Sequence, residues 1–114
     1  MTQSCIFCKI ITKQVPTQVI AENDTTLVIK DINPKAPIHY LIIPKKHVQD
    51  IQTMQQADAE LFGDIALMAQ YLSHNAGQEN PQAFRLVMNN GQAAGQRVFH
   101  MHMHYLSGSL STEL

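Results

Sequence analysis

The sequence holds no long apolar run and no basic segment that leads into one. No apolar stretch approaches the roughly 20 residues that a membrane span needs. The opening "MTQSCIFCKIITK" also lacks the charged and apolar regions of a secretory signal. We therefore expect a cytoplasmic protein that has no membrane partner.

Charge is also sparse and evenly spread. Only 15% of the residues are charged, the formal net charge is −1, and Lys and Arg are interspersed with Asp and Glu. A nucleic-acid-binding surface needs a clustered basic face, so we expect no nucleic-acid partner. A local phosphate site stays open, because backbone amides and histidines can bind an anion without a large net charge.

Cysteines are few, and repeats and low-complexity tracts are absent from the sequence. Cys5 and Cys8 are too close in sequence to cross-link a fold, which fits a reducing compartment. The pair therefore indicates metal binding, redox chemistry or core packing. Because no segment has the composition of a linker, we expect one domain over residues 1–114, with a packed core over about 5–106.

The order of helical and strand patterns predicts an α+β fold with a mainly antiparallel five-stranded sheet, one short helix and one long helix. The expected elements are a helix within 5–14, strands over 17–23, 25–32, 38–44, 84–90 and 98–106, and a long helix that ends at Gly77. Thr53 and Gln56 match a capping box before the long helix. The expected buried face of that helix has four residues at helical spacing: Leu61, Ile65, Met68 and Leu72.

Three histidines alternate along the last expected strand, "VFHMHMHYLSG". In an extended strand, His100, His102 and His104 would share one face, while Phe99, Met101, Met103 and Tyr105 would share the other. The second face indicates core and the first indicates chemistry. Three explanations are open: a solvated strand face, a three-histidine metal centre, or nucleophilic catalysis in which a neutral imidazole attacks phosphorus beside a protonated one.

The segment before these histidines favours phosphate chemistry. "NNGQAAGQRV" supplies the side-chain amide of Asn89 and a loop with Gly91 and Gly95, whose backbone can approach an anion closely. Several N–H donors in such a loop suit phosphate oxygens better than they suit the other ligands of a metal. The loop therefore favours nucleophilic catalysis over the metal centre.

These segments together resemble the histidine triad superfamily, and within it the nucleotide-binding, Hint-type phosphoramidase branch. The resemblance rests on "HMHMHYL", "NNGQAAGQRVFHMHMH", "KDINPKAPIHYLIIPKKH" and "CIFCKII", and it extends from Cys5 to Gly108. It implies a homodimer that joins two five-stranded sheets. It also implies hydrolysis of a purine nucleoside 5′-phosphoramidate, or a related nucleotidylated compound, to the nucleoside monophosphate through a nucleotidyl-histidine, with no cofactor required for the chemistry.

The resemblance also implies roles for single residues. His102 would be the nucleophile, and His104 would contact the phosphate and, together with His39, order the imidazoles. His100 would orient the nucleophile through its carbonyl. Asp31 would bind the ribose hydroxyls, although it also suits a plain turn. The residues implied to surround the nucleotide are Phe7, Ile29, Asp31, Ile32, Leu41, Asn89, Gly95, Gln96, Arg97 and Val98. For the apolar ones, simple core packing is the alternative.

One position departs from the resemblance. Close relatives usually carry a small hydroxyl residue where this chain has Arg97, and that hydroxyl is placed to assist the departing amine. Arg97 leaves two alternatives open, an added cation near phosphate or a solvated side chain. It also keeps open a non-catalytic module that binds purine nucleotides or a protein partner.

A second group of residues indicates a possible structural zinc. Some members of the superfamily pair two cysteines with the histidine of the "PKKH" segment and the first histidine of the triad. The matching residues here are Cys5, Cys8, His47 and His100, a set of thiol and imidazole ligands typical of zinc. The alternative is that both cysteines are buried as small apolar side chains.

Overall fold

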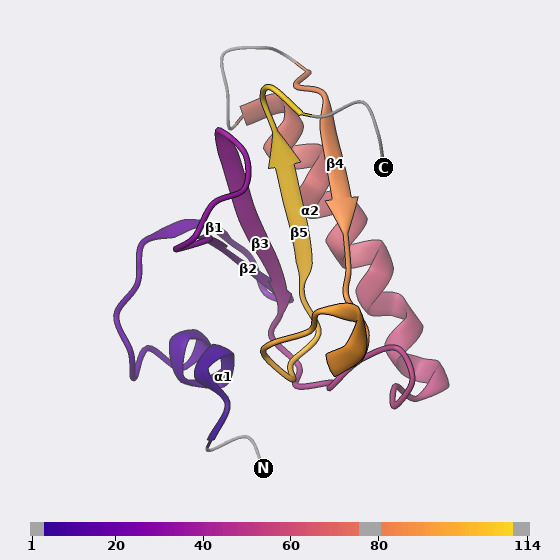
Figure 1. The fold of residues 1–114 in the computed structure, drawn as a ribbon. Helices are drawn as coiled ribbons and strands as arrows, with labels where there is room; N and C mark the ends of the chain where they lie inside the picture. Colours follow the sequence, from indigo (N-terminus) through magenta and orange to yellow (C-terminus); the bar gives the residue numbers. More distant parts are fainter. Residues whose placement is uncertain (1–3, 76–80, 111–114) are drawn as a thin grey trace.

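The structure, a computed structural model, describes residues 4–75 and 81–110, and its five strands form one sheet (Figure 1). The strands are β1 (Val19–Glu22), β2 (Thr26–Lys30), β3 (Ile38–Pro44), β4 (Phe84–Val87) and β5 (Met103–Ser107). Their order across the sheet is β1-β2-β3-β5-β4, and every neighbouring pair is antiparallel. The predicted α+β fold, with a five-stranded antiparallel sheet and one long and one short helix, is confirmed.

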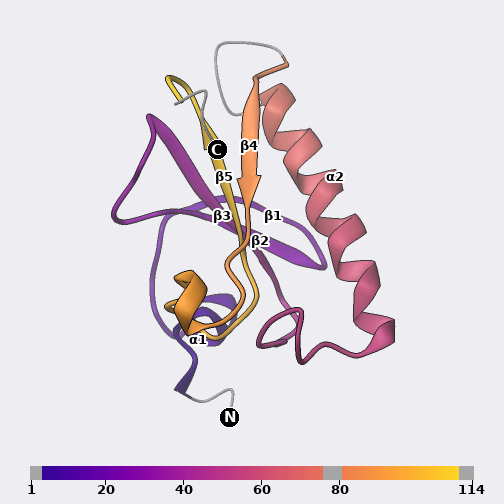
Figure 2. The ribbon, with the colours of Figure 1, turned by 45° about the vertical axis from the view of Figure 1, so that its right-hand side comes forward.

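Helices cover both faces of this sheet. Helix α1 (Ile6–Ile11) lies against one face and helix α2 (Glu60–Asn75) against the other (Figures 1 and 2). Two short 3-10 turns, η2 (Gln56–Ala59) and η3 (Gln92–Ala94), lie in the connections. Neither α-helix of the described ranges combines the length and the apolar character needed to cross a membrane.

Alternation along the central strands produces two apolar layers. On β2, Leu27 and Ile29 face α1, whereas Val28 between them faces α2. The layer on the α1 side contains Cys5, Phe7, Ile10, Leu27, Ile29, Leu41 and Ile43. The layer on the α2 side contains Val28, Ile42, Ile65, Met68, Ala69, Leu72 and Tyr105. The predicted buried face of the long helix is confirmed, because its four apolar residues are all buried.

The predicted capping box is wrong. Thr53 does not cap a helix, because its amide donates to the Asp50 side chain (2.9 Å) within a turn. The box lies two residues later, where the amide of Gln55 donates to the Asp58 carboxylate (2.9 Å) before η2. A carboxylate at the third helical position satisfies a free amide better than the predicted Gln56 would. The predicted helix end at Gly77 lies outside the described residues.

The histidine-bearing strand is shorter than predicted, and this changes where its side chains lie. Strand β5 begins only at Met103, so His100 and His102 precede it in irregular backbone. There the amide of Met101 donates to the carbonyl of Val48 (2.6 Å) instead of to a neighbouring strand. The predicted core face is also only partly right, because Tyr105 is fully buried whereas Phe99 is 45% exposed.

Candidate active site

Three histidines converge on the face of the sheet that α1 covers. His39 lies on β3, and His104 on β5 pairs with Leu41, whose side chain belongs to the α1 layer. His102 lies just before β5, with its ring 5.3 Å from the ring of His104. The ring of Phe7, from α1, meets His102 edge-on at 5.0 Å. The sheet and α1 together therefore enclose the nucleophile candidate, of which only 8% is exposed.

Hydrogen bonds fix the proton positions on two of these rings. The amide of Lys35 donates to Nδ1 of His39 (3.0 Å), so this nitrogen carries no hydrogen. Nε2 of His39 must then carry the hydrogen, and it donates to Nδ1 of His104 (2.8 Å). His104 consequently keeps its own hydrogen on Nε2. The chain of bonds ends in the Nε2–H of His104, which has no hydrogen-bond acceptor among residues 4–75 and 81–110.

A separate bond orients His102. Nδ1 of His102 lies 2.7 Å from the carbonyl oxygen of His100, and because a carbonyl only accepts, Nδ1 must donate. The lone pair of the neutral ring is therefore on Nε2. This is the tautomer that a nucleophilic imidazole requires, and it is held from within the same segment.

Burial keeps these imidazoles neutral. Desolvation lowers the pKa of His102 and of His39 below its usual value, although the charge of Asp31 opposes the shift in both. For His104, desolvation and the neighbouring rings of His102 and His39 lower the pKa to about 4. At pH 7 the free protein therefore presents neutral rings. The sequence led us to expect a protonated imidazole beside the nucleophile, but the free site does not contain one.

Asp31 lies beside this pair of rings. One carboxylate oxygen accepts the amide hydrogen of Asn33 (2.8 Å). This contact forms a turn, which is the alternative role that the sequence suggested for Asp31. The other oxygen is 3.4 Å from Nε2 of His39 and 3.9 Å from Nδ1 of His104. The side chain is only 17% exposed, so its remaining acceptor capacity points to the histidine cluster more than to bulk solvent.

The glycine loop is braced from inside by Gln96. Its buried side chain accepts from the amide of Gly91 (2.8 Å) and donates to the carbonyls of Gln49 (2.8 Å) and Val98 (3.1 Å). The resemblance placed Gln96 among the nucleotide contacts, but all of these side-chain bonds go to backbone. The sequence signal for this brace is weak, because a single glutamine in a polar loop is ordinary.

The two glycines give the rest of the loop its backbone shape. Gly91 and Gly95 have φ values of 95° and 99°, which only glycine adopts readily. The side chain of Asn89 donates to the carbonyl of Ala94 (2.8 Å) and lies 3.6 Å from where a side chain on Gly95 would begin. A distance of 3.6 Å is an ordinary contact, so the cost of a larger residue at position 95 would come from its strained backbone conformation.

Three of the four expected base-pocket residues lie together, and one does not. Phe7, Ile29 and Leu41 are buried in the α1 layer, and Val98 packs against that layer. Ile32 is completely exposed and lies outside this layer. The structure thus brings most of the expected apolar wall to one place, where it also serves as core.

The two cysteines and two histidines predicted to bind zinc also lie together. Nδ1 of His100 is 3.4 Å from Sγ of Cys5, 3.6 Å from Sγ of Cys8 and 3.1 Å from Nδ1 of His47. Nδ1 of His47 is 3.2 Å from Sγ of Cys8. All four donor atoms lie within 4.8 Å of one another.

With the histidine cluster, the glycine loop and the thiol cluster described, comparison with known proteins assigns the family. The family model described as the HIT domain matches residues 12–110. The chain belongs to the HIT family. An uncharacterized HIT-like protein of Synechocystis is 41% identical over 108 residues, which cover 95% of this chain and 93% of that protein.

Solved structures agree with this assignment. A HIT family hydrolase from Legionella pneumophila is 39% identical with a TM-score of 0.88, and the match covers 96% of this chain and 97% of that one. A zinc-bound histidine triad family protein from Mycobacterium smegmatis is 29% identical with a TM-score of 0.82, covering 100% and 81% of the two chains. The HIT fold and the order of its segments are thus shared over nearly the whole chain.

The thiol cluster of this HIT domain suits a tetrahedral cation. Ligand atoms that surround one zinc ion at its usual bond lengths are about 3.3–3.8 Å apart, close to the four separations given above. Nε2 of His100 donates to the carbonyl of Pro44 (2.7 Å), which leaves the Nδ1 lone pair directed into the cluster. Burial, and next the neighbouring Cys5 thiol, raise the pKa of Cys8 to about 11, so a metal would have to displace its proton.

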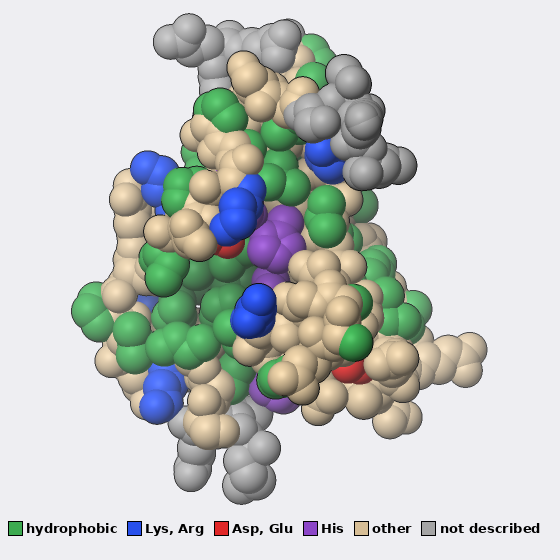
Figure 3. Space-filling view, viewed as in Figure 1, with side chains coloured by type: hydrophobic (Ala, Val, Ile, Leu, Met, Phe, Trp, Pro, Cys, Tyr) green, Lys and Arg blue, Asp and Glu red, His purple; other side chains and the backbone are tan. Residues whose placement is uncertain are grey.

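The surface of this HIT domain shows where a substrate can approach. In Figure 3 a histidine surface (purple) is visible near the centre of the face, between two Lys or Arg side chains (blue). A broad apolar surface (green) lies beside it. Imidazole, cation and apolar surface therefore meet on one open face of the molecule.

Proposed function

We propose that this protein hydrolyses purine nucleoside 5′-phosphoramidates, or related nucleotidylated compounds, to the nucleoside monophosphate. The observation that carries the proposal is the orientation of His102. Its Nδ1–H is held by the carbonyl of His100, so the Nε2 lone pair is available on a ring that is neutral at pH 7. The HIT family assignment and the named HIT family hydrolase among similar structures support a hydrolytic reaction.

In the first step, Nε2 of His102 attacks phosphorus and forms a P–N bond. The bond between phosphorus and the departing nitrogen breaks, and that nitrogen takes up one proton to leave as an amine. The Nε2–H of His104 donates a hydrogen bond to a phosphate oxygen. Because Nδ1 of His104 already accepts the hydrogen of His39, His104 stays neutral, and the proton that the departing nitrogen takes up comes from solvent.

In the second step, water attacks phosphorus and the bond to Nε2 of His102 breaks. The lone pair returns to Nε2, and one proton of the water replaces the proton delivered in the first step. The sum is the phosphoramidate plus water giving an amine and a nucleoside monophosphate. No metal or redox cofactor takes part in this sequence.

The nucleotide fits the remaining groups of the same face. Asp31 can accept hydrogen bonds from two ribose hydroxyls, and the apolar side chains of Phe7, Ile29 and Leu41 suit a purine. Asn89 and the backbone amides from Gly95 to Val98 hold the phosphate, with the loop kept in shape by Gln96. Ile32 would have to fold over the bound base, because it is fully exposed without one.

Turnover of a fluorogenic adenosine 5′-phosphoramidate tests this function. We expect release of the amine and AMP with saturation kinetics, because nucleophile and phosphate loop lie on one face. AMP affinity, measured in parallel, distinguishes this enzyme from a protein that only binds nucleotides. Tight AMP binding without detectable turnover would instead indicate a non-catalytic nucleotide-binding module.

We further propose that the thiol cluster holds a structural zinc ion. Cys5 and Cys8 at the start of α1 would be linked to His47, after β3, and to His100. Four protein ligands leave no open coordination position for substrate. The zinc-bound relative from Mycobacterium smegmatis supports the proposal, and the separations of the donor atoms fit it.

A homodimer is the expected assembly. Strand β4 is an edge of the sheet, and Phe84 and Leu86 on it are 39% and 37% exposed. Helix α2, which runs beside β4 in both ribbon views, exposes Leu67 and Tyr71 at 65% and 54% (Figures 1 and 2). A second copy that pairs its own β4 with this edge would cover the patch and continue the sheet.

We expect sedimentation at micromolar concentration to give a dimer, and Leu67→Glu to shift it toward monomer by at least tenfold in the dissociation constant, since a charge would be buried in the interface. Ile51→Glu is the matched control, because Ile51 is 44% exposed but lies outside α2 and β4. A wild-type protein that stays monomeric, or equal weakening by both variants, contradicts this interface.

A further inference from the structure

Arg97 is a cation that has no partner among the described residues. Its side chain is exposed, and within the part of the chain that the structure describes it makes no hydrogen bond or ion pair. It directly follows the buried brace Gln96 and precedes Val98, whose side chain packs on the α1 layer. Its backbone position is therefore fixed on both sides while its guanidinium stays available to a ligand.

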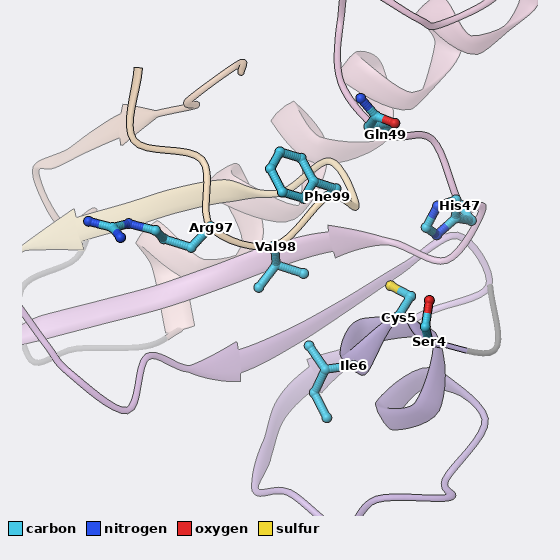
Figure 4. Close-up of a pocket in the computed structure, with 8 residues that line it drawn as sticks. All are labelled: Ser4, Cys5, Ile6, His47, Gln49, Arg97, Val98 and Phe99. Carbon is cyan, nitrogen blue, oxygen red and sulfur yellow. The ribbon is translucent and has the colours of Figure 1, made fainter. Parts of the chain in front are cut away.

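A cavity of about 360 Å³ opens beside Arg97, between the start of α1 and the segment 97–99. Figure 4 shows Val98 and Ile6 facing each other across it, with His47 and Cys5 at one end and the Arg97 side chain extending away from them toward the other. None of the described residues that line it carries a carboxylate. Among the described residues that line it, Arg97 is the one with a permanent charge.

Charge therefore divides the site into two sides. On the side where the nucleoside is proposed to bind, the carboxylate Asp31 lies with His39 and His104, and the cation Lys35 acts on the same two histidines. On the cavity side, the described lining residues include the cation Arg97 and no carboxylate. Two residues of the loop proposed to hold the phosphate, Arg97 and Val98, also line the cavity. The departing group leaves phosphorus on the side opposite the nucleophile. It must therefore extend away from the nucleoside and toward the side that carries Arg97.

We propose that Arg97 selects substrates whose departing group carries a negative charge, a carboxylate or a phosphate, a short chain away from the nitrogen that is released. This assignment rests on the proposed phosphoramidate hydrolysis. A guanidinium donates two parallel hydrogen bonds to either anion, and the neighbouring cavity accommodates the rest of the departing group. The residue thus gives specificity for the leaving group and takes no part in breaking the bond.

Three substrates of equal chain length test the proposal: the adenosine 5′-phosphoramidates of β-alanine amide, β-alanine and O-phosphoethanolamine. They differ only in a neutral, carboxylate or phosphate end. We expect wild-type kcat/KM for at least one anionic substrate to exceed that for the neutral one by about fivefold to tenfold, the scale of a charge-assisted pair near solvent. The ratio for each anion distinguishes a carboxylate from a phosphate ligand.

Two variants separate leaving-group recognition from other effects. Arg97→Gln should reduce the anionic-to-neutral ratio to below two, and Arg97→Lys should keep part of it. Lys35→Gln is the matched control, because Lys35 is a cation on the Asp31 side, close enough for its charge to act on His39 and His104, and its removal should leave the ratio within twofold of wild type.

Each outcome bears on a different statement. A wild-type ratio below two, or an equal loss for all three substrates in Arg97→Gln, overturns the assignment; the second result places Arg97 on the phosphate shared by all three. An equal drop of the ratio in Lys35→Gln overturns it too, because the preference would then arise from general charge. If no substrate is turned over while AMP binds, the proposed function fails and the assignment fails with it.

Discussion

His102→Ala is expected to lower turnover of an adenosine phosphoramidate by roughly 10³- to 10⁵-fold, the scale seen when other catalytic nucleophiles are removed. The substitution deletes the ring whose Nδ1–H is held by the carbonyl of His100 and whose Nε2 lone pair is free for the proposed attack. It leaves Asn89 and the loop amides in place, so AMP binding should change by less than about tenfold. Stopped-flow turnover and calorimetric AMP titration measure the two quantities.

The same prediction has a direct chemical readout. Intact-protein mass spectrometry after rapid mixing, quenched in base because a phosphorus–imidazole bond is acid-labile, should find a nucleotidyl group on His102. His74→Ala is the matched control, because His74 is exposed near the end of α2 and its loss should leave activity at the wild-type value. Full activity of His102→Ala, or an adduct on His104 with His102 unmodified, would overturn the assignment of the nucleophile.

Much of the fold is predictable because it follows from local patterns. Alternation and turn residues locate all five strands, and β3 has the predicted bounds. The strand that carries the histidines is the exception. Alternating residues satisfy a strand pattern whether or not a partner strand is present, and before Met103 the chain bonds to the segment after β3 through Val48. A bond between segments so far apart in the sequence depends on the tertiary structure, so local patterns do not predict it.

The candidate site, like the fold, is predictable only in part. The residue types could be recognised from the sequence and its resemblance, and the structure brings the four predicted zinc ligands within 4.8 Å of one another. The hydrogen-bond donor for His39 could not be predicted, because it is a backbone amide, that of Lys35, supplied by the turn before β3. The inward role of Gln96 is equally hidden, since glutamine has no preference for a brace over a ligand contact.

The sharing of His100 between two clusters is also visible only in three dimensions. Its ring nitrogen faces Cys5, Cys8 and His47, while its carbonyl accepts the hydrogen of His102. The contacts of the ring nitrogen affect the stability of the fold, and the contact of the carbonyl affects the proposed reaction. A metal at the thiol cluster would therefore hold the peptide that orients the nucleophile, without reaching the substrate.

Zinc removal is expected to lower the thermal midpoint of unfolding by roughly 10 °C or more, which corresponds to about 3 kcal/mol in a domain of this size. The reason is that one ion would join α1 to the segment after β3 and to residue 100, and four ligands leave it closed to substrate. Well below that midpoint, kcat should fall less than threefold on chelation. Calorimetry and steady-state kinetics with and without chelator measure both effects.

Cys8→Ser is the control for chelation, because a protein with one ligand removed should unfold near the midpoint of the chelated wild type and respond little to chelator. Zinc affinity should also rise with pH, since burial raises the pKa of Cys8 to about 11 and binding must release its proton. Elemental analysis that finds no zinc in protein purified without chelator would remove the structural role. Loss of activity on chelation with an unchanged midpoint would instead favour a metal that acts in the chemical step.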